Sequence, residues 1–140
     1  MCFDDVYEEN LRLDEGEKQS ILDNGIAVWM FVNEALAGET YGICPTNLDE
    51  AIEDYDGTDP GVIYCYSTTL LPEFQGLRLG KILKAFWLGQ CKERGFHKVI
   101  GHATSPAMVE VNRFFGATFS AVHENWYETG RVARFYELPL

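Results

Sequence analysis

The stretch "GVIYCYSTTLLPEFQGLRLGKIL", residues 61–83, decides the fold expected of this chain. Its first eleven residues are rich in β-branched and aromatic side chains, which predicts a strand that ends at Pro72. A glycine-containing turn follows, and the apolar residues after it recur at helical spacing, so we expect a helix over 79–94 that Gly95 caps. The residues expected to face inward from this helix are Leu79, Ile82, Leu83, Phe86 and Trp87.

The turn at 75–81 is the first candidate for a binding site. It is not a Walker loop, because Gly76 and Gly80 enclose three residues instead of four and the lysine is followed by isoleucine. The dinucleotide pattern GxGxxG is also absent. A turn between a strand and a helix can still direct successive backbone amides at a diphosphate, or it can be a plain connection without a ligand. We predict a helical φ at Arg78, with its side chain pointing outward.

The remaining segments complete an α/β pattern. The expected elements are a polar helix over 4–24, a hairpin over 26–43, an acidic loop or short helix over 45–60 that suits the rim of a site, a strand over 97–104, a helix over 105–115 and strands over 117–124 and 131–140. Gly25 is expected to end the first helix in the left-handed conformation. The strand, helix and strand after residue 61 predict a parallel pair with a crossover helix, hence a single domain over 1–140 with a mixed sheet.

Composition limits the class of protein. A chain of 140 residues with 46% apolar and 14% aromatic residues can bury a core as one domain. No apolar run is long enough to span a bilayer, and the first residues are acidic where a signal peptide is basic, so we expect a cytoplasmic protein without a membrane partner. The four cysteines are scattered and form no CxxC pair. They predict reduced thiols, with Cys65 and Cys91 buried, and neither a disulfide framework nor a metal site.

Charge is distributed unevenly along the chain. Residues 1–60 hold 16 of the 22 acids and two of the 11 bases, whereas six bases fall within residues 78–98. These bases suit either a phosphate-bearing ligand or a solvated helix face. The net charge of −11 disfavours nucleic acid as a partner. The acidic first half would attract a polyamine, an aminoglycoside or a lysine-bearing peptide, although acidity also serves solubility alone.

Three segments carry a family resemblance. Gln75 and Gly80 match the first and last positions of the pattern Gln/Arg-x-x-Gly-x-Gly/Ala, while Arg78 stands where that pattern has its first glycine. The strand end "TTLLPEFQG" precedes this match, and "HATSPAMVEVNRFFGATF" follows it. Together these segments resemble the GNAT superfamily of acyl-CoA-dependent N-acetyltransferases, with a likeness that covers about residues 61–140.

This resemblance implies a mixed, mostly antiparallel sheet that splays between the family's fourth and fifth strands, with acetyl-CoA in the gap. Peptide groups around Leu70 and Leu71 would pair with pantetheine, and one amide would polarise the thioester carbonyl. Lys81 and Lys84 would screen phosphates or lie on a solvated face. The residues expected to bind the cofactor are Leu70, Leu71, Gln75, Gly76, Leu77, Arg78, Leu79, Gly80 and Lys81.

The resemblance also implies direct attack by a primary amine, on a small molecule or a lysine-bearing peptide, and no metal. The family's helix tyrosine corresponds to Phe115 and its strand glutamate to Tyr64, so neither usual proton-transfer role carries over. His102, at the end of a strand beside the gap, is the first candidate for the base. Ser105, which also suits a helix cap, and Tyr127 are the other catalytic candidates.

Two other functions fit the same sequence. Without the usual tyrosine and glutamate, the chain would be a non-catalytic acyl-CoA binder or sensor. Alternatively, its acidic first half would make it a protein-interaction module. His123 is expected at the surface, and a homodimer is compatible with the sequence.

Overall fold

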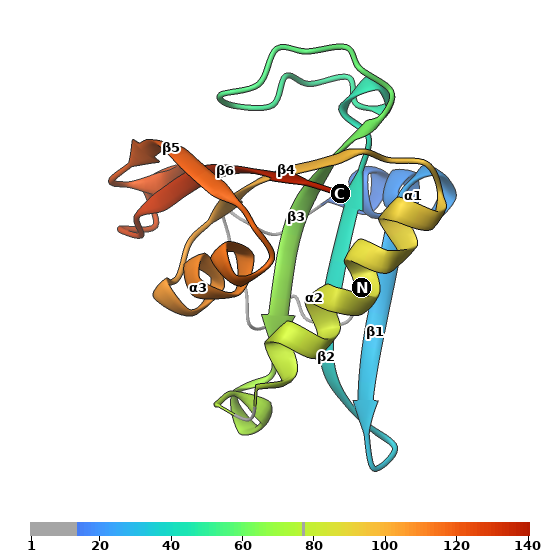
Figure 1. Ribbon diagram of the computed structural model, residues 1–140, viewed down its shortest axis with the longest axis vertical. Helices are drawn as coiled ribbons and strands as arrows, with labels where there is room; N and C mark the ends of the chain where they lie inside the picture. Colours follow the sequence, from blue (N-terminus) through green and yellow to red (C-terminus); the bar gives the residue numbers. More distant parts are fainter. Residues whose placement is uncertain (1–13, 77) are drawn as a thin grey trace.

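A computed structural model of the chain describes residues 14–76 and 78–140 (Figure 1). Within them, the elements follow the expected order. They are α1 (Glu15–Asn24), β1 (Ile26–Val32), β2 (Ala35–Ile43), β3 (Val62–Leu70), α2 (Leu79–Glu93), β4 (Lys98–Ala103), α3 (Pro106–Phe114), β5 (Thr118–His123) and β6 (Ala133–Pro139), with short 3₁₀ turns η3 (Pro45–Asn47), η4 (Pro72–Phe74) and η5 (Trp126–Glu128). The earlier part of the helix expected over 4–24 lies outside the described residues.

The strands form one sheet in the order β1-β2-β3-β4-β6-β5. Every neighbouring pair is antiparallel except β3 and β4, which are parallel and are connected through α2. The predicted mixed sheet with one crossover helix is therefore confirmed. Figure 1 shows β1, β2 and β3 along the long axis of the molecule, whereas β4, β6 and β5 run across it.

The sheet splays between β3 and β4, which are the strands that the family resemblance numbers fourth and fifth. Their pairing runs only from Val62 opposite Lys98 to Cys65 opposite Gly101, although β3 continues to Leu70. On the side of β4, the last five residues of β3 therefore lie beside a gap, while on the other side the strand remains paired with β2. This confirms the position of the predicted opening.

A β-bulge marks the start of this gap. Gly42 pairs with Cys65 and Tyr41 with Ser67, so Tyr66 is an extra residue on β3 without a partner opposite it in β2. A bulge reverses the alternation of side chains between the two faces of a strand and increases the local twist. It thus turns β3 away from β4 at the point where their pairing ends.

Helices cover both faces of the first three strands. On one face α2 packs Leu83, Trp87 and Cys91 against the sheet, and the indole of Trp87 donates a hydrogen bond to the carbonyl of Ile26 (3.0 Å). On the other face, Ile21 of α1 packs with residues of β2. A layered core of this kind holds the strand ends around the gap in place.

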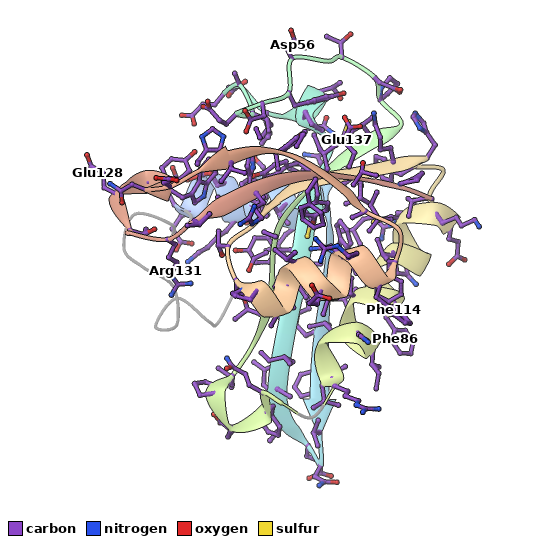
Figure 2. All side chains as sticks on the ribbon, turned by 60° about the vertical axis from the view of Figure 1, so that its left-hand side comes forward. Asp56, Phe86, Phe114, Glu128, Arg131 and Glu137 are labelled. Atoms are coloured by element: carbon purple, nitrogen blue, oxygen red, sulfur yellow. The ribbon has the colours of Figure 1, made fainter. Side chains whose placement is uncertain are left out.

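The buried face of α2 differs from the expected one. Leu83 and Trp87 are buried as predicted, but Ile82 and Phe86 are 47% and 65% exposed, and Phe86 projects from the surface (Figure 2). The helical period is as predicted, but the buried face is rotated relative to the expected one. The expectation counted apolar residues alone, whereas the buried face includes Lys84. The buried residues of α2 are Gly80, Leu83, Lys84, Trp87, Leu88 and Cys91.

Lys84 is the unexpected core residue, with 1% of its surface exposed. Its Nζ lies 3.2 Å from the hydroxyl of Tyr136, 3.3 Å from the sulfur of Cys65 and 3.5 Å from the hydroxyl of Thr68. The same Nζ lies 5.1 Å from the ring centre of Trp87. Neutral hydrogen-bond acceptors and ring faces therefore surround this side chain. Both roles predicted for Lys84, at phosphates or in solvent, are wrong because it points into the core.

Two turns show where glycine is needed. Gly25 does not take the predicted left-handed conformation, because its φ of −100° leads directly into β1. A side chain there would instead place its Cβ 2.3 Å from the carbonyl oxygen of Gly42, so close backbone approach is the reason for this glycine. In the hairpin, Asn33 and Glu34 both have positive φ, as a two-residue turn requires. Gly95, with a φ of 92°, follows α2 as predicted.

Three of the four cysteines lie within the described residues. Cys44, Cys65 and Cys91 are free and buried, which confirms the predicted thiols for these positions, while Cys2 lies outside the described residues. Among the residues that the structure describes, no helix is both long and apolar enough to cross a membrane.

Candidate functional site

The end of β3 presents peptide groups to the gap. The amide of Leu71 donates to the carbonyl of Ala37 (2.8 Å), and the carbonyl of Leu71 accepts from the amide of Phe74 (2.9 Å). Because backbone groups alternate along a strand, the N–H and C=O of Leu70 and Thr68 face the gap instead. Of the two residues predicted to pair with pantetheine, Leu70 thus directs its N–H toward the gap while its carbonyl accepts from Gln75, and both backbone groups of Leu71 are bonded within the chain.

The turn after β3 holds Gln75 and two residues of positive φ. The side-chain amide of Gln75 donates to the carbonyl of Leu70 (3.1 Å), and Gly76 has a φ of 79°. Arg78, the N-cap of α2, has φ 62° and ψ 13°. The predicted helical φ at Arg78 is wrong, because this backbone position needs the left-handed conformation that glycine adopts most easily. The side chain of Arg78 is exposed, as expected.

The first turn of α2 points toward the same region. The N–H groups of Leu79, Gly80 and Lys81 belong to the first turn, where amides have no acceptor within the helix and the helix dipole is positive. Lys81 is exposed, and its Nζ lies 4.2 Å from the ring centre of Phe114. The predicted cofactor residue Leu77 lies outside the described part of the chain. The remaining predicted residues thus gather around the end of β3 and the start of α2.

A cavity of about 410 Å³ lies on the α1 side of the sheet. Tyr64 and Tyr66 of β3 contribute to its wall, together with Trp126 and the predicted site residue Tyr127 from η5. Its lining includes no Lys or Arg among the described residues. The acidic lining residues are Asp14, Glu17, Asp49, Glu50 and Glu53. Part of the segment 45–60 therefore lines a cavity, and the acidic lining favours cations over anions there.

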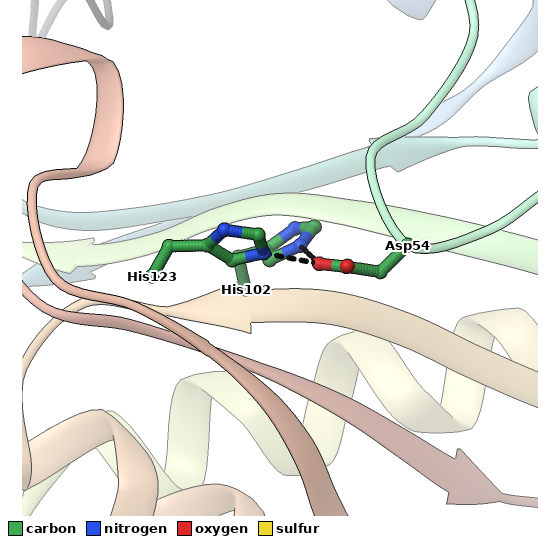
Figure 3. Close-up of side chains that lie close together, drawn as sticks. All are labelled: Asp54, His102 and His123. Carbon is green, nitrogen blue, oxygen red and sulfur yellow. Dashed lines mark hydrogen bonds and ion pairs between the residues drawn. The ribbon is translucent and has the colours of Figure 1, made fainter.

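Beside this cavity, three segments bring two histidines onto one carboxylate (Figure 3). The Nε2 atoms of His102 and His123 lie 2.9 and 2.6 Å from the same oxygen, Oδ2 of Asp54. On its other side, Nδ1 of His102 lies 2.7 Å from the hydroxyl of Tyr64. Because Nε2 faces a carboxylate, it carries the proton, and Nδ1 accepts the hydrogen of Tyr64. The indole of Trp126 stacks on His102, with ring centres 4.3 Å apart.

Burial sets the protonation states of this cluster. Burial lowers the pKa of His102, although the hydrogen bond to Asp54 acts against this. Burial alone would raise the pKa of Asp54, but the hydrogen bonds from the two histidines outweigh it and lower that pKa. Burial also raises the pKa of Tyr64 far above its ordinary value. Near neutral pH the arrangement is therefore a protonated Tyr64, a neutral His102 and an ionised Asp54.

The predicted catalytic residues are separated by this geometry. The side chain of His102 is only 2% exposed, and Tyr64 lies between it and the cavity. His102 would therefore not contact an amine substrate in the cavity directly. The hydroxyl of Ser105 accepts from the amide of Met108 (3.1 Å), which confirms its role as the cap of α3. Tyr127 lines the cavity, as expected for a residue from the last hairpin.

Sequence reasoning missed Asp54 and the place of His123. Asp54 is one acid in an acidic run, and no local pattern separates it from its neighbours. His123 was expected at the surface, but its side chain is 30% exposed and bonded to Asp54. Only the fold brings these residues to His102, because they lie 48 and 21 positions away from it along the chain.

Several solved structures that resemble this fold are acetyltransferases. The GNAT superfamily phosphinothricin acetyltransferase from Sinorhizobium meliloti, in complex with acetyl-CoA, is similar with a TM-score of 0.70 and 20% identity, over 91% of this chain and 70% of its own. For the IAA acetyltransferase from Bacillus cereus the TM-score is 0.68, with 13% identity over 91% of this chain and 85% of its own. The ribosomal-protein-S18-alanine N-acetyltransferase from Escherichia coli has a TM-score of 0.66 and 14% identity, over 91% and 77%.

No protein-family model and no curated protein sequence matches the chain. At identities of this size the likeness to the solved structures concerns the arrangement of the backbone. The aligned part covers 91% of this chain in each of the three, with TM-scores of 0.66 to 0.70. This chain therefore has the fold of the GNAT superfamily of acetyltransferases.

Proposed function

We propose that this protein transfers the acetyl group of acetyl-CoA to a primary amine. The observation that carries the proposal is the hydrogen-bonded series of Tyr64, His102 and Asp54, which connects an acidic cavity to the point where β3 leaves β4. Such a series can accept a proton from an amine that enters the cavity. The amine is expected on a cationic small molecule or on a lysine-bearing peptide.

The gap and the start of α2 suit the cofactor. The peptide groups of Thr68 and the N–H of Leu70 face the gap, and the amides of pantetheine would pair with them like a neighbouring strand. The carbonyl of Leu70 accepts from Gln75, so pantetheine would have to share or replace that hydrogen bond. The first-turn amides of α2 would receive the diphosphate, with Arg78 and Lys81 exposed beside them. Acetyl-CoA would supply the activated acetyl thioester. Structures of similar fold were solved with CoA or acetyl-CoA, which supports this part of the proposal.

The cavity suits an ammonium-bearing acceptor. Five carboxylates line it, and a cationic amine would be drawn toward them. An ammonium group cannot attack a thioester until it loses a proton. Tyr64 provides the route, because its oxygen can accept that proton while its own hydrogen passes to Nδ1 of His102.

Asp54 then stabilises the charged imidazole that results. Its carboxylate lies 2.9 Å from Nε2 of His102 and holds the ring in the tautomer that leaves Nδ1 free to accept. The same path in reverse returns a proton to the departing thiolate. In this scheme Tyr64 is the catalytic residue, whereas His102 and Asp54 are positioning residues that act through it.

The test is release of free thiol from acetyl-CoA across a panel of amines. Tyr64→Phe removes one hydroxyl and is expected to lower kcat by roughly 100-fold with little change in the KM for acetyl-CoA. Tyr127→Phe is the matched comparison, because it removes a hydroxyl from the same cavity. A larger loss at Tyr127 than at Tyr64 would reject the assignment.

The same experiment separates an enzyme from a binder. Acetyl-CoA is expected to raise the melting temperature of the protein, since a ligand that binds only the folded state stabilises it. Stabilisation without thiol release on any amine would leave the non-catalytic acyl-CoA binder as the function. No stabilisation would remove the cofactor from the proposal and leave the protein-interaction module.

A further inference from the structure

We propose that Asp54, His102 and His123 form a binding site for a divalent transition-metal ion, with Zn²⁺ as the ion that fits best. The three ligand atoms, one carboxylate oxygen and two imidazole nitrogens, all lie within 4.8 Å of one another. Figure 3 shows the two imidazoles turned toward the same carboxylate from different strands. Three convergent side chains of these types are a common set of protein ligands for zinc.

The donor set selects the kind of ion. Two imidazole nitrogens and one carboxylate suit Zn²⁺, Co²⁺ or Ni²⁺, whereas Mg²⁺ and Ca²⁺ prefer oxygen ligands alone. Three protein ligands also leave a fourth tetrahedral position for water. The expectation of no metal rested on the scattered cysteines and on the family resemblance, and neither takes account of these three residues, which the fold assembles from separate segments.

The surroundings of the cluster support a metal ligand role for His102. Its second nitrogen, Nδ1, lies 2.7 Å from the hydroxyl of Tyr64, and a metal-bound histidine commonly has such an outer partner on its other nitrogen. Trp126 stacks on the ring and restricts its rotation. The imidazole is thus held with Nε2 directed at Asp54 before any ion arrives.

The acidic cavity adjoins the cluster. Glu53 lies next to Asp54 in the chain, and it lines the cavity together with Tyr64 and Trp126, which both contact His102. The carboxylates of this cavity raise the local concentration of cations. The side chains of Asp54 and His123 are 19% and 30% exposed, so the cluster is open to solvent on their side although His102 is buried.

Metal binding has a consequence for the reaction. An ion on Nε2 of His102 displaces the proton from that nitrogen and requires the tautomer with the proton on Nδ1, where it would donate to the hydroxyl of Tyr64. His102 then has no free position to accept the hydrogen of Tyr64. We expect Zn²⁺ to inhibit acetyl transfer for this reason, and this consequence rests on the proposed function, whereas the binding of the ion does not.

The binding test uses the untagged, chelator-treated protein. Titration calorimetry with Zn²⁺ is expected to give one ion per chain, and Co²⁺ is expected to give the visible absorption bands of a tetrahedral site. His123→Gln and Asp54→Asn should each weaken Zn²⁺ binding by at least about 100-fold, beyond the loss of an outer partner. Circular dichroism and thermal melting of each variant show that it is folded.

His97→Gln is the matched control. His97 is the third histidine of the chain, and its Nε2 lies 2.7 Å from Asp59, an exposed pair away from the cluster. The control should bind Zn²⁺ as the unchanged protein does. Absence of saturable Zn²⁺ binding, or an equal loss in His97→Gln and His123→Gln, would overturn the proposed site.

The inhibition is measured separately. Thiol release should fall when Zn²⁺ is added and return with a chelator, and the ratio of activities with and without Zn²⁺ should approach one in His123→Gln. Turnover that persists with Zn²⁺ bound would overturn the inhibitory role while keeping the site. Zinc binding with no turnover even in chelated protein would keep the site and reject the acetyltransferase.

Discussion

Arg78→Gly should stabilise this protein. Arg78 has a φ of 62°, and the left-handed conformation costs a residue with a Cβ roughly 1–2 kcal/mol. Glycine removes that cost but adds about 0.4–1 kcal/mol of chain entropy to the unfolded state. The difference is a net gain of about 0.5–1 kcal/mol. For 140 residues the unfolding entropy is about 0.3 kcal/mol/K, so the melting temperature should rise by about 2–3 °C.

Thermal unfolding followed by circular dichroism measures this gain, and two variants serve as controls. Arg78→Ala also removes the exposed side chain but keeps the Cβ, so it should give no increase. Arg113→Gly changes an exposed arginine inside α3, where glycine is unfavourable, and should cost about 1 kcal/mol. A lower melting temperature for Arg78→Gly, or an equal rise for Arg78→Ala, would refute the argument from backbone conformation.

The same variant tests how the turn holds the cofactor. If backbone amides receive the diphosphate, Arg78→Gly should keep the dissociation constant for acetyl-CoA within about threefold, since the amide remains. A loss of tenfold or more, which corresponds to about 1.4 kcal/mol, would show that the guanidinium carries the interaction.

Two predictions concern the core beneath α2. Lys84→Met should leave the free energy of unfolding in urea unchanged or raise it, because it replaces a buried amino group with an apolar side chain of similar length. Lys84→Ala should lower it by about 2–5 kcal/mol through the cavity it leaves, and a loss of that size in both variants would contradict this account. Gly42→Ala should cost about 1–3 kcal/mol, because its Cβ would lie 2.4 Å from the carbonyl of Tyr64 and 2.7 Å from Trp87. Gly89→Ala, with open space at its Cβ, should instead gain up to about 1 kcal/mol, and equal effects at both glycines would reject the packing argument.

Much of the fold follows from local patterns in the sequence. The strand, turn and helix after residue 61 were predictable, because β-branched residues, Pro72 and helical spacing all act over a few residues. The burial of Lys84 was not predictable, since it depends on Tyr136 and Cys65 from two other elements. The positive φ of Arg78 was also not predicted. The family pattern has glycine at this position, and the arginine that replaces it does not show whether the backbone still adopts the left-handed conformation.

The candidate site divides in the same way. His102 and Tyr127 were identified from their positions near expected strand ends, and both lie at or beside the cavity. Asp54 and His123 were missed because their importance comes from a meeting of distant segments. A single sequence does not show that Asp54 and His123 approach His102, because this depends on the order of the strands and on the course of the loop that carries Asp54.

The sheet consists of two halves, β1-β2-β3 and β4-β6-β5, which are joined by one short parallel ladder. In this ladder Val62 pairs with Lys98 and Cys65 with Gly101, and beyond it the two halves diverge. A molecule that forms hydrogen bonds to both β3 and β4 beside the opening would connect the two halves of the sheet a second time and restrict their movement relative to each other.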